Sequence, residues 1–190
     1  MKSARWTAAT TVGFVLGGGA LHSPGASGVG GAFLDWDVSA TIFGAILGAI
    51  VGTITGLLQN IALGRRDLRV FIAMVVTVAI AHALADGAPA MWGVTAVAAL
   101  SGLVAAIANA WAARLWDARS VVVALVAWWA GWMGGVALAG ALGLSFGSTP
   151  DAWATEHVVI AGVLGLAFGT ATSPAMRRIL RSERALSSAG

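Results

Sequence analysis

The chain has 190 residues, of which 58% are hydrophobic and 10% are charged, and its mean hydropathy is +0.87. Soluble domains carry about a quarter charged residues, so this composition excludes an ordinary water-soluble globule. The chain contains no Cys, which excludes disulfides, thiolate metal sites and cysteine nucleophiles. The apolar residues are spread over nearly the whole length, and we therefore predict a single integral membrane domain over residues 1–190.

Six stretches are apolar enough to cross a membrane as helices, a length of about 20 residues each. In chain order they cover residues 6–22, 38–63, 69–86, 90–113, 120–144 and 157–176. The sequence therefore predicts an all-α membrane protein with six transmembrane helices.

The charged residues separate the connections into two kinds. All 11 Lys and Arg residues lie before the first stretch, in the connections after the second and fourth stretches, or after the sixth. The other connections carry only acidic charges, namely Asp35, Asp37, Asp86, Asp151 and Glu156. Because Lys and Arg are enriched in cytoplasmic loops, we expect a multi-pass protein of the cytoplasmic membrane with both termini in the cytoplasm. This bias also explains the basic pI, so no nucleic-acid partner is predicted.

The N-terminal segment has a second interpretation. Residues 1–26 also have the layout of a cleaved secretory signal, with Lys2 and Arg5 before an apolar run and small residues after it. In that case every later helix would keep the same orientation.

A stripe of small residues recurs in the second, fourth and sixth stretches. The three stripes are Gly44, Gly48, Gly52 and Gly56; Gly93, Val97, Ser101 and Ala105; and His157, Ala161, Gly165 and Gly169. A spacing of four places each stripe on one helix face, where two backbones can approach closely. We predict three repeated helical hairpins with the even-numbered helices in an inner layer. The stripes would then be packing contacts or, alternatively, the walls of a ligand cavity.

The second stretch also carries a resemblance. The zipper Gly48, Gly52 and Gly56, followed by Gln59 and the pair Arg65 and Arg66, resembles a pattern in uncharacterised bacterial multi-pass membrane proteins. In that pattern a glycine zipper runs into Gln and then Arg at the cytoplasmic end, and the resemblance implies no activity. In size and number of spans, the chain is also similar to the six-helix substrate-binding components of energy-coupling vitamin transporters.

Polar side chains inside the stretches are few. Gln59, Asn60 and Asn109 lie toward the cytoplasmic ends, where an amide bridges neighbouring helices or, alternatively, contacts a ligand. The middle of each stretch lacks Lys, Arg, Asp and Glu, so the carboxylates of an ion-coupled pump are missing. Pro174 is expected to end the sixth helix.

Histidines and carboxylates gather toward the outer side. His22, His82 and His157 lie there, and Asp86 is one helical turn from His82. No cofactor is predicted, but these side chains suggest a divalent metal site or a pH switch as alternatives. His82 alone would suit the axial position of a haem or chlorin.

The functional hypothesis follows from what the sequence contains. Ser residues have no partnered base at a readable spacing, so no enzyme is predicted. Trp128, Trp129 and Trp132 are expected on the surface, facing lipid, another subunit or a pigment. The leading hypothesis is a scaffold or accessory subunit of a larger membrane complex. Its expected partners are the lipid bilayer and other membrane subunits or, alternatively, further copies of the chain. The alternative is a small transporter or substrate-binding component for a divalent metal or a small organic ligand.

Overall fold

The structure is a computed structural model that describes residues 2–21, 38–64, 66–88, 93–114, 117–144 and 150–187. Of residues 2, 17–21, 94, 150–154 and 177–187 it describes the backbone only. The helices are α1 (Lys2–Leu21), α2 (Val38–Leu63), α3 (Leu68–Gly87), α4 (Gly93–Ala113), α5 (Ala118–Ala141) and α6 (Pro150–Ser187).

The described residues confirm an all-helical protein. Five of the six helices contain a segment long and apolar enough to cross a membrane. These segments are Val38–Leu63, Leu68–Gly87, Thr95–Ala113, Ala118–Ala141 and Thr155–Met176. In α1, both backbone and side chains are described only over residues 3–16, which is shorter than a span of about 20 residues.

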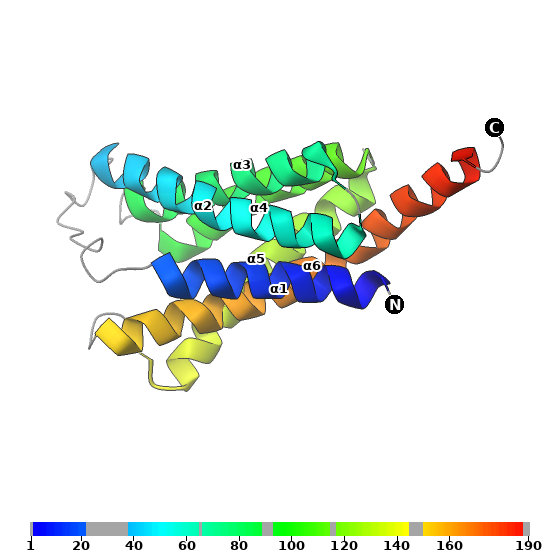
Figure 1. Cartoon of the computed structure of the whole chain (residues 1–190). Helices are drawn as coiled ribbons and strands as arrows, with labels where there is room; N and C mark the ends of the chain where they lie inside the picture. The colour runs from blue at the N-terminus through cyan, green and yellow to red at the C-terminus, as the bar shows by residue number, and fades with distance from the viewer. Residues whose placement is uncertain are drawn as a thin grey trace.

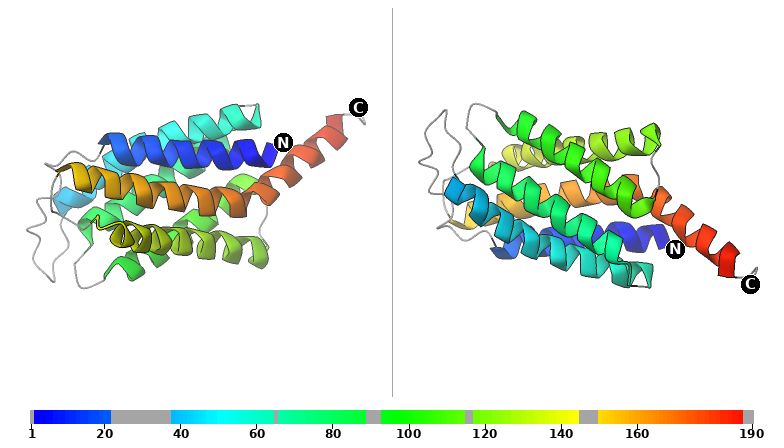
Figure 2. Two further views of the ribbon diagram at one scale, coloured as in Figure 1. Left: turned by 90° about the horizontal axis from the view of Figure 1, so that it is seen from below. Right: turned by 90° about the horizontal axis from the view of Figure 1, so that it is seen from above.

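The helices form a closed ring in which each helix packs against its neighbours in the sequence. The last helix, α6, packs against α1 and so closes the ring, and both views in Figure 2 show the two helices side by side. The helices run alternately in opposite directions, so the N-terminus lies at the same end as the C-terminal part of α6 (Figure 1). We call this end the terminal end and the other the opposite end.

The prediction of an inner layer of even-numbered helices is wrong. Among the described residues, no Cα atom of α2 lies within 8 Å of one in α4 or α6, and α4 comes this close to α6 at only a few positions. The glycine stripe of α2 faces α3 instead. A Cβ atom added to Gly52 would lie 2.6 Å from the Cα atom of Val75, and one added to Gly48 would overlap the carbonyl oxygen of Val78. A small-residue stripe needs one partner helix only, and a neighbour in the ring supplies it.

The glycines of α5 and α6 are used in the same way. A Cβ atom on Gly165 of α6 would lie 2.8 Å from the Cα atom of Thr11 in α1, and one on Gly135 of α5 would lie 2.7 Å from that of Ile160 in α6. These contacts join helices that follow one another around the ring. The three-hairpin repeat itself stays a prediction.

The expectation that Pro174 ends the sixth helix is also wrong. Pro174 lies inside α6, which continues to Ser187 and extends past the other helices at the terminal end (Figure 1). Proline removes one backbone hydrogen bond, but the following residues, Ala175 to Ser187, are rich in Arg, Leu, Ala and Glu, which favour helix. Local propensity therefore carries the helix beyond the proline.

Two turns at the terminal end have parallel construction. Asp67 and Asp117 are the N-caps of α3 and α5, each accepting backbone N–H groups of the first helical turn. Gly64 and Arg114 follow the ends of α2 and α4 and adopt left-handed φ angles of +69° and 55°. Glycine adopts this conformation freely, whereas an Arg there is strained.

Candidate functional site

The interior of the ring has three parts along its length. Histidines and carboxylates lie near the opposite end, an aromatic layer crosses the middle, and a small cavity with a few polar side chains in a largely apolar wall lies nearer the terminal end. Each part contains at least one side chain that the sequence analysis singled out.

The aromatic layer consists of Phe14, Trp128 and Phe168, from α1, α5 and α6. Trp128 is 1% exposed, and its ring meets those of Phe14 and Phe168 edge-on at centroid distances of 5.7 and 5.2 Å. Its Nε1–H group donates to the Ser101 hydroxyl of α4 at 3.1 Å. The prediction of a surface position is therefore wrong for Trp128.

The other two tryptophans of α5 differ from Trp128. Trp132 is half-buried against the core, and Trp129 is 40% exposed on the outer face. Trp128 faces inward because it shares a helix face with Ala124, Gly131 and Gly135, the small residues by which α5 packs into the ring.

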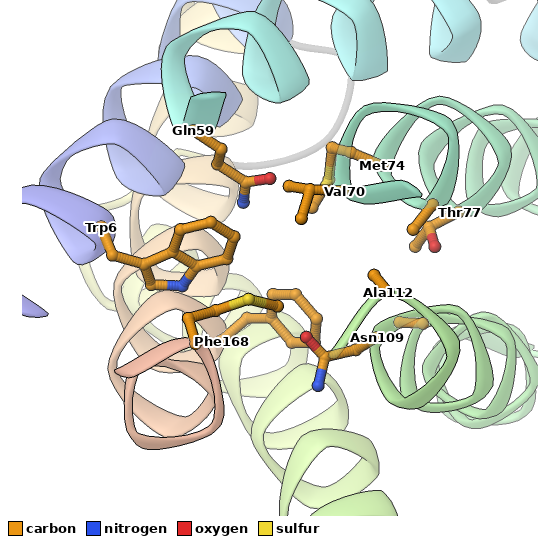
Figure 3. Close-up of a pocket in the computed structure, with 11 residues that line it drawn as sticks. Trp6, Gln59, Val70, Met74, Thr77, Asn109, Ala112 and Phe168 are labelled. Carbon is orange, nitrogen blue, oxygen red and sulfur yellow. The ribbon is translucent and has the colours of Figure 1, made fainter. Parts of the chain in front are cut away.

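The cavity lies between the aromatic layer and a second apolar cluster at the terminal end (Figure 3). Its volume is about 10 Å³, and roughly 10–15 Å³ is needed for one water molecule. The lining residues come from α1, α2, α3, α4 and α6: Trp6, Gln59, Val70, Ala73, Met74, Thr77, Ala105, Asn109, Ala112, Phe168 and Met176. The cavity is thus a small space between five helices of the ring, flanked by an apolar cluster on each side.

A chain of hydrogen bonds fixes the orientation of Gln59 at the cavity wall. The Thr10 hydroxyl donates to the carbonyl oxygen of Trp6 at 2.9 Å, and the Nε2 group of Gln59 donates to that hydroxyl at 2.9 Å. Gln59 is 0% exposed, and its Oε1 atom has no hydrogen-bond partner. Figure 3 shows this carboxamide turned toward the space between Val70, Trp6 and Phe168.

The same kind of contact joins α1 to α6. The Thr172 hydroxyl donates to the carbonyl oxygen of Phe168 at 2.8 Å and accepts the Nε1–H group of Trp6 at 3.0 Å. A hydroxyl that donates within its own helix keeps its lone pairs free for a neighbour's N–H group. Sequence reasoning singled out Gln59 but missed Trp6, Thr10 and Thr172, which carry no charge and form no motif.

Asn60 and Asn109, each four residues after the end of a small-residue stripe, have different surroundings. Asn60 accepts the N–H group of Asp67 at 2.9 Å and donates to the carbonyl oxygen of Asp67 at 3.3 Å, and so holds the turn before α3. Asn109 lines the cavity and is 8% exposed. One amide thus fixes a turn while the other faces the interior.

The ionisable residues near the opposite end come from two helices that do not pack together. His82 and Asp86 are half-buried on α3, and His157 is half-buried near the start of α6, close enough for an electrostatic interaction with His82. The Nδ1 atom of His82 lies 3.0 Å from the carbonyl oxygen of Val78. Glu156 is 1% exposed, and its Oε2 atom has no hydrogen-bond partner.

These residues do not assemble a metal centre in the part of the chain that the structure describes. No group of three or more His, Asp or Glu side chains there is arranged to hold a metal ion. His22, Asp35 and Asp37 lie outside the described residues. The metal and haem or chlorin alternatives therefore stay hypotheses that rest on His82, Asp86 and His157.

Comparison with known protein families, with curated proteins and with solved structures finds no match to this chain.

Proposed function

We propose that this protein is a non-enzymatic membrane scaffold or accessory subunit that binds other membrane subunits through the outer face of α5. The observation that supports this proposal is the close packing of the ring's interior over the residues that the structure describes. The aromatic layer of Phe14, Trp128 and Phe168 closes the middle of the ring, and the cavity beside it has a volume of only about 10 Å³. Ligand sites usually measure about 300–1,000 Å³, so a packed structural role fits better than a substrate chamber.

The outer face of α5 is the proposed contact surface. Val122, Val126 and Trp129 are exposed at 54%, 51% and 40%, and their spacing places them on one helix face. Tryptophan is enriched at interfaces because it buries a large area at little entropic cost. A partner helix would therefore find both an aromatic anchor and aliphatic surface there.

We further propose that the terminal end faces the cytoplasm. The support is the bias of Lys and Arg toward that end, where Arg66, Arg69, Arg114 and Arg119 lie at or beside the turns. Reporter fusions at residues 67 and 151 test this orientation. A cytoplasm-active reporter is expected to work only at residue 67 and a periplasm-active one only at residue 151, and the reverse pattern would contradict the orientation.

Purification from membranes in a mild detergent, followed by native mass spectrometry, tests the scaffold proposal. We expect stoichiometric partner subunits that are lost in Val126→Trp, which alters the α5 face, and kept in the matched control Ile61→Trp on α2. Ile61 is 74% exposed and lies on a different helix. A lone monomer or a simple homo-oligomer would contradict the proposal.

The alternative function is a small transporter or substrate-binding component, with entry at the opposite end. The observation that favours it is the presence of His82, Asp86 and His157 between that end and the aromatic layer. Isothermal titration with Zn²⁺, Ni²⁺ and Co²⁺ compares the wild type with the double variant His82→Ala and His157→Ala. Binding heat that disappears in the variant would favour the transporter, and equal heats or none would remove the metal version of it.

A further inference from the structure

We infer that the cavity beside Gln59 is a binding site for one buried water molecule, which joins α2 to α4 across the middle of the ring. Two independent observations carry this inference, namely the unpartnered Oε1 atom of the fully buried Gln59 and the cavity it faces. The inference concerns how the ring is held together and does not depend on the proposed scaffold function.

The hydrogen bonds around Thr10 determine which atom of the Gln59 amide faces the cavity. Thr10 has a single hydroxyl hydrogen, and that hydrogen is donated to the carbonyl oxygen of Trp6. Thr10 can therefore only accept from Gln59, so the Nε2 group must be turned toward it. The Oε1 atom, a hydrogen-bond acceptor, is left facing the cavity.

An acceptor in this position requires a donor. A carbonyl oxygen that loses its hydrogen bonds to water on burial destabilises the folded state unless another donor replaces them. The nearby walls are largely apolar, including Val70, Met74 and Phe168. A water molecule can donate to Gln59 Oε1 from within the cavity.

The size and lining of the cavity select water over a larger ligand. Its volume of about 10 Å³ is close to the minimum for a single water molecule. A buried water usually makes two to four hydrogen bonds, and the cavity also presents the polar side chains of Asn109 and Thr77. Asn109 and Thr77 can therefore supply the hydrogen bonds that the water needs beyond the one it donates to Gln59 Oε1.

The position of this water has a structural consequence. Among the described residues no Cα atom of α2 lies within 8 Å of a Cα atom of α4, yet Gln59 of α2 and Asn109 of α4 line the same cavity (Figure 3). A water bound to both amides would couple two helices that are not neighbours in the ring. The site is therefore a polar bridge through the interior rather than another contact around the rim.

The direct test is the structure of the full chain in lipid nanodiscs, with water itself as the probe. Cryo-electron microscopy at a resolution that shows ordered water is expected to reveal one density peak at hydrogen-bond distance from Gln59 Oε1. Water-edited NMR of the wild type with ¹⁵N-labelled Gln is expected to show magnetisation transfer from a slowly exchanging water to the Gln59 side chain. An empty cavity, or an amide whose Oε1 atom is turned toward Thr10, would overturn the inference.

A double-mutant cycle tests the bridge. Gln59→Met and Asn109→Leu each keep side-chain volume while removing the amide, and each is expected to lower the unfolding temperature by roughly 2–4 °C. If one water binds both amides, the double variant should lose clearly less than the sum of the two shifts. Additive shifts would overturn the bridge. If a variant fails to fold, the density and NMR measurements on the wild type still decide whether the water is present.

Discussion

The α2–α3 interface and the interfaces of α1 hold the ring together by different means. Between α2 and α3, glycines such as Gly48 and Gly52 let the two backbones meet. Around α1, Trp6 and Thr10 hydrogen-bond to Thr172 of α6 and Gln59 of α2. Lipid chains provide no hydrophobic drive for helices to associate, so close packing and interhelical hydrogen bonds must do so. This bundle uses close packing at the first interface and interhelical hydrogen bonds at the second.

The largest expected effect breaks the close-packed interface. Gly48→Leu places a side chain against the backbone of Val78 and Ala79, and we expect a loss of about 3 kcal/mol or more in the free energy of unfolding. Unfolding in mixed micelles of increasing SDS content, followed by circular dichroism, measures this loss. The matched control is Gly140→Leu on α5, where an added Cβ meets no atom within 4 Å. Equal destabilisation by both variants would contradict close packing as the cause.

The next effect concerns the hydrogen-bonded interface. Thr172→Val leaves the Trp6 Nε1–H group without its acceptor, and we expect a loss of about 1–2 kcal/mol in the free energy of unfolding. A double-mutant cycle with Trp6→Phe measures the coupling between the two side chains, expected at about 0.6 kcal/mol and at most about 1.7. A coupling of zero would mean that the 3.0 Å contact contributes nothing to stability.

The next effect concerns the turns before α3 and α5. The carboxylate of Asp67 accepts the N–H groups of Arg69 and Val70, and the carboxylate of Asp117 accepts the N–H group of Ser120. Loss of an N-cap costs about 0.5–2 kcal/mol. In thermal unfolding we expect Asp67→Ala and Asp117→Ala each to lower the free energy of unfolding by an amount within this range. No loss in either variant would show that the cap contacts do not determine the stability of these turns.

The smallest effect is a stabilisation. Arg114 has the left-handed backbone that Gly64 adopts at the corresponding position after α2. Arg114→Gly should remove this strain and raise the free energy of unfolding by about 0.5 kcal/mol, because part of the gain is offset by the greater freedom of glycine in the unfolded chain. Arg114→Ala serves as the control, since it removes the charge but keeps the strain. Equal effects of the two substitutions would assign the change to the charge instead.

The sequence predicted the elements better than their partners. The bounds 38–63 of the second span agree with α2 because glycine periodicity and flanking charges both mark its ends. A small-residue stripe defines one face of a helix, however, and says nothing about which helix covers it, so the stripe of α2 was assigned to the wrong neighbours. Trp6 and Thr172 are separated by 166 positions, and no local pattern connects them.

The candidate site was also predictable only in part, because local sequence patterns reveal some of its side chains and not others. Amides in apolar helices are conspicuous, so Gln59 and Asn109 stood out as polar contacts. Hydroxyl and indole groups do not stand out in this way, because Thr and Trp are tolerated widely in membrane helices. Only the three-dimensional placement of the neighbouring helices shows that Trp128 faces inward and that Gln59 Oε1 faces a cavity.

Closure of the ring by α6 onto α1 imposes an order on biogenesis. Polypeptides are synthesised from the N-terminus, so α1 and α2 enter the membrane early and can form the Gln59 to Thr10 contact at once. The Trp6 to Thr172 contact, and the packing of Gly165 and Gly169 against α1, must wait until the last helix has been translated. During that interval the ring is open between α1 and α5. A nascent chain arrested before α6 would therefore offer those two helix edges to the membrane insertion machinery.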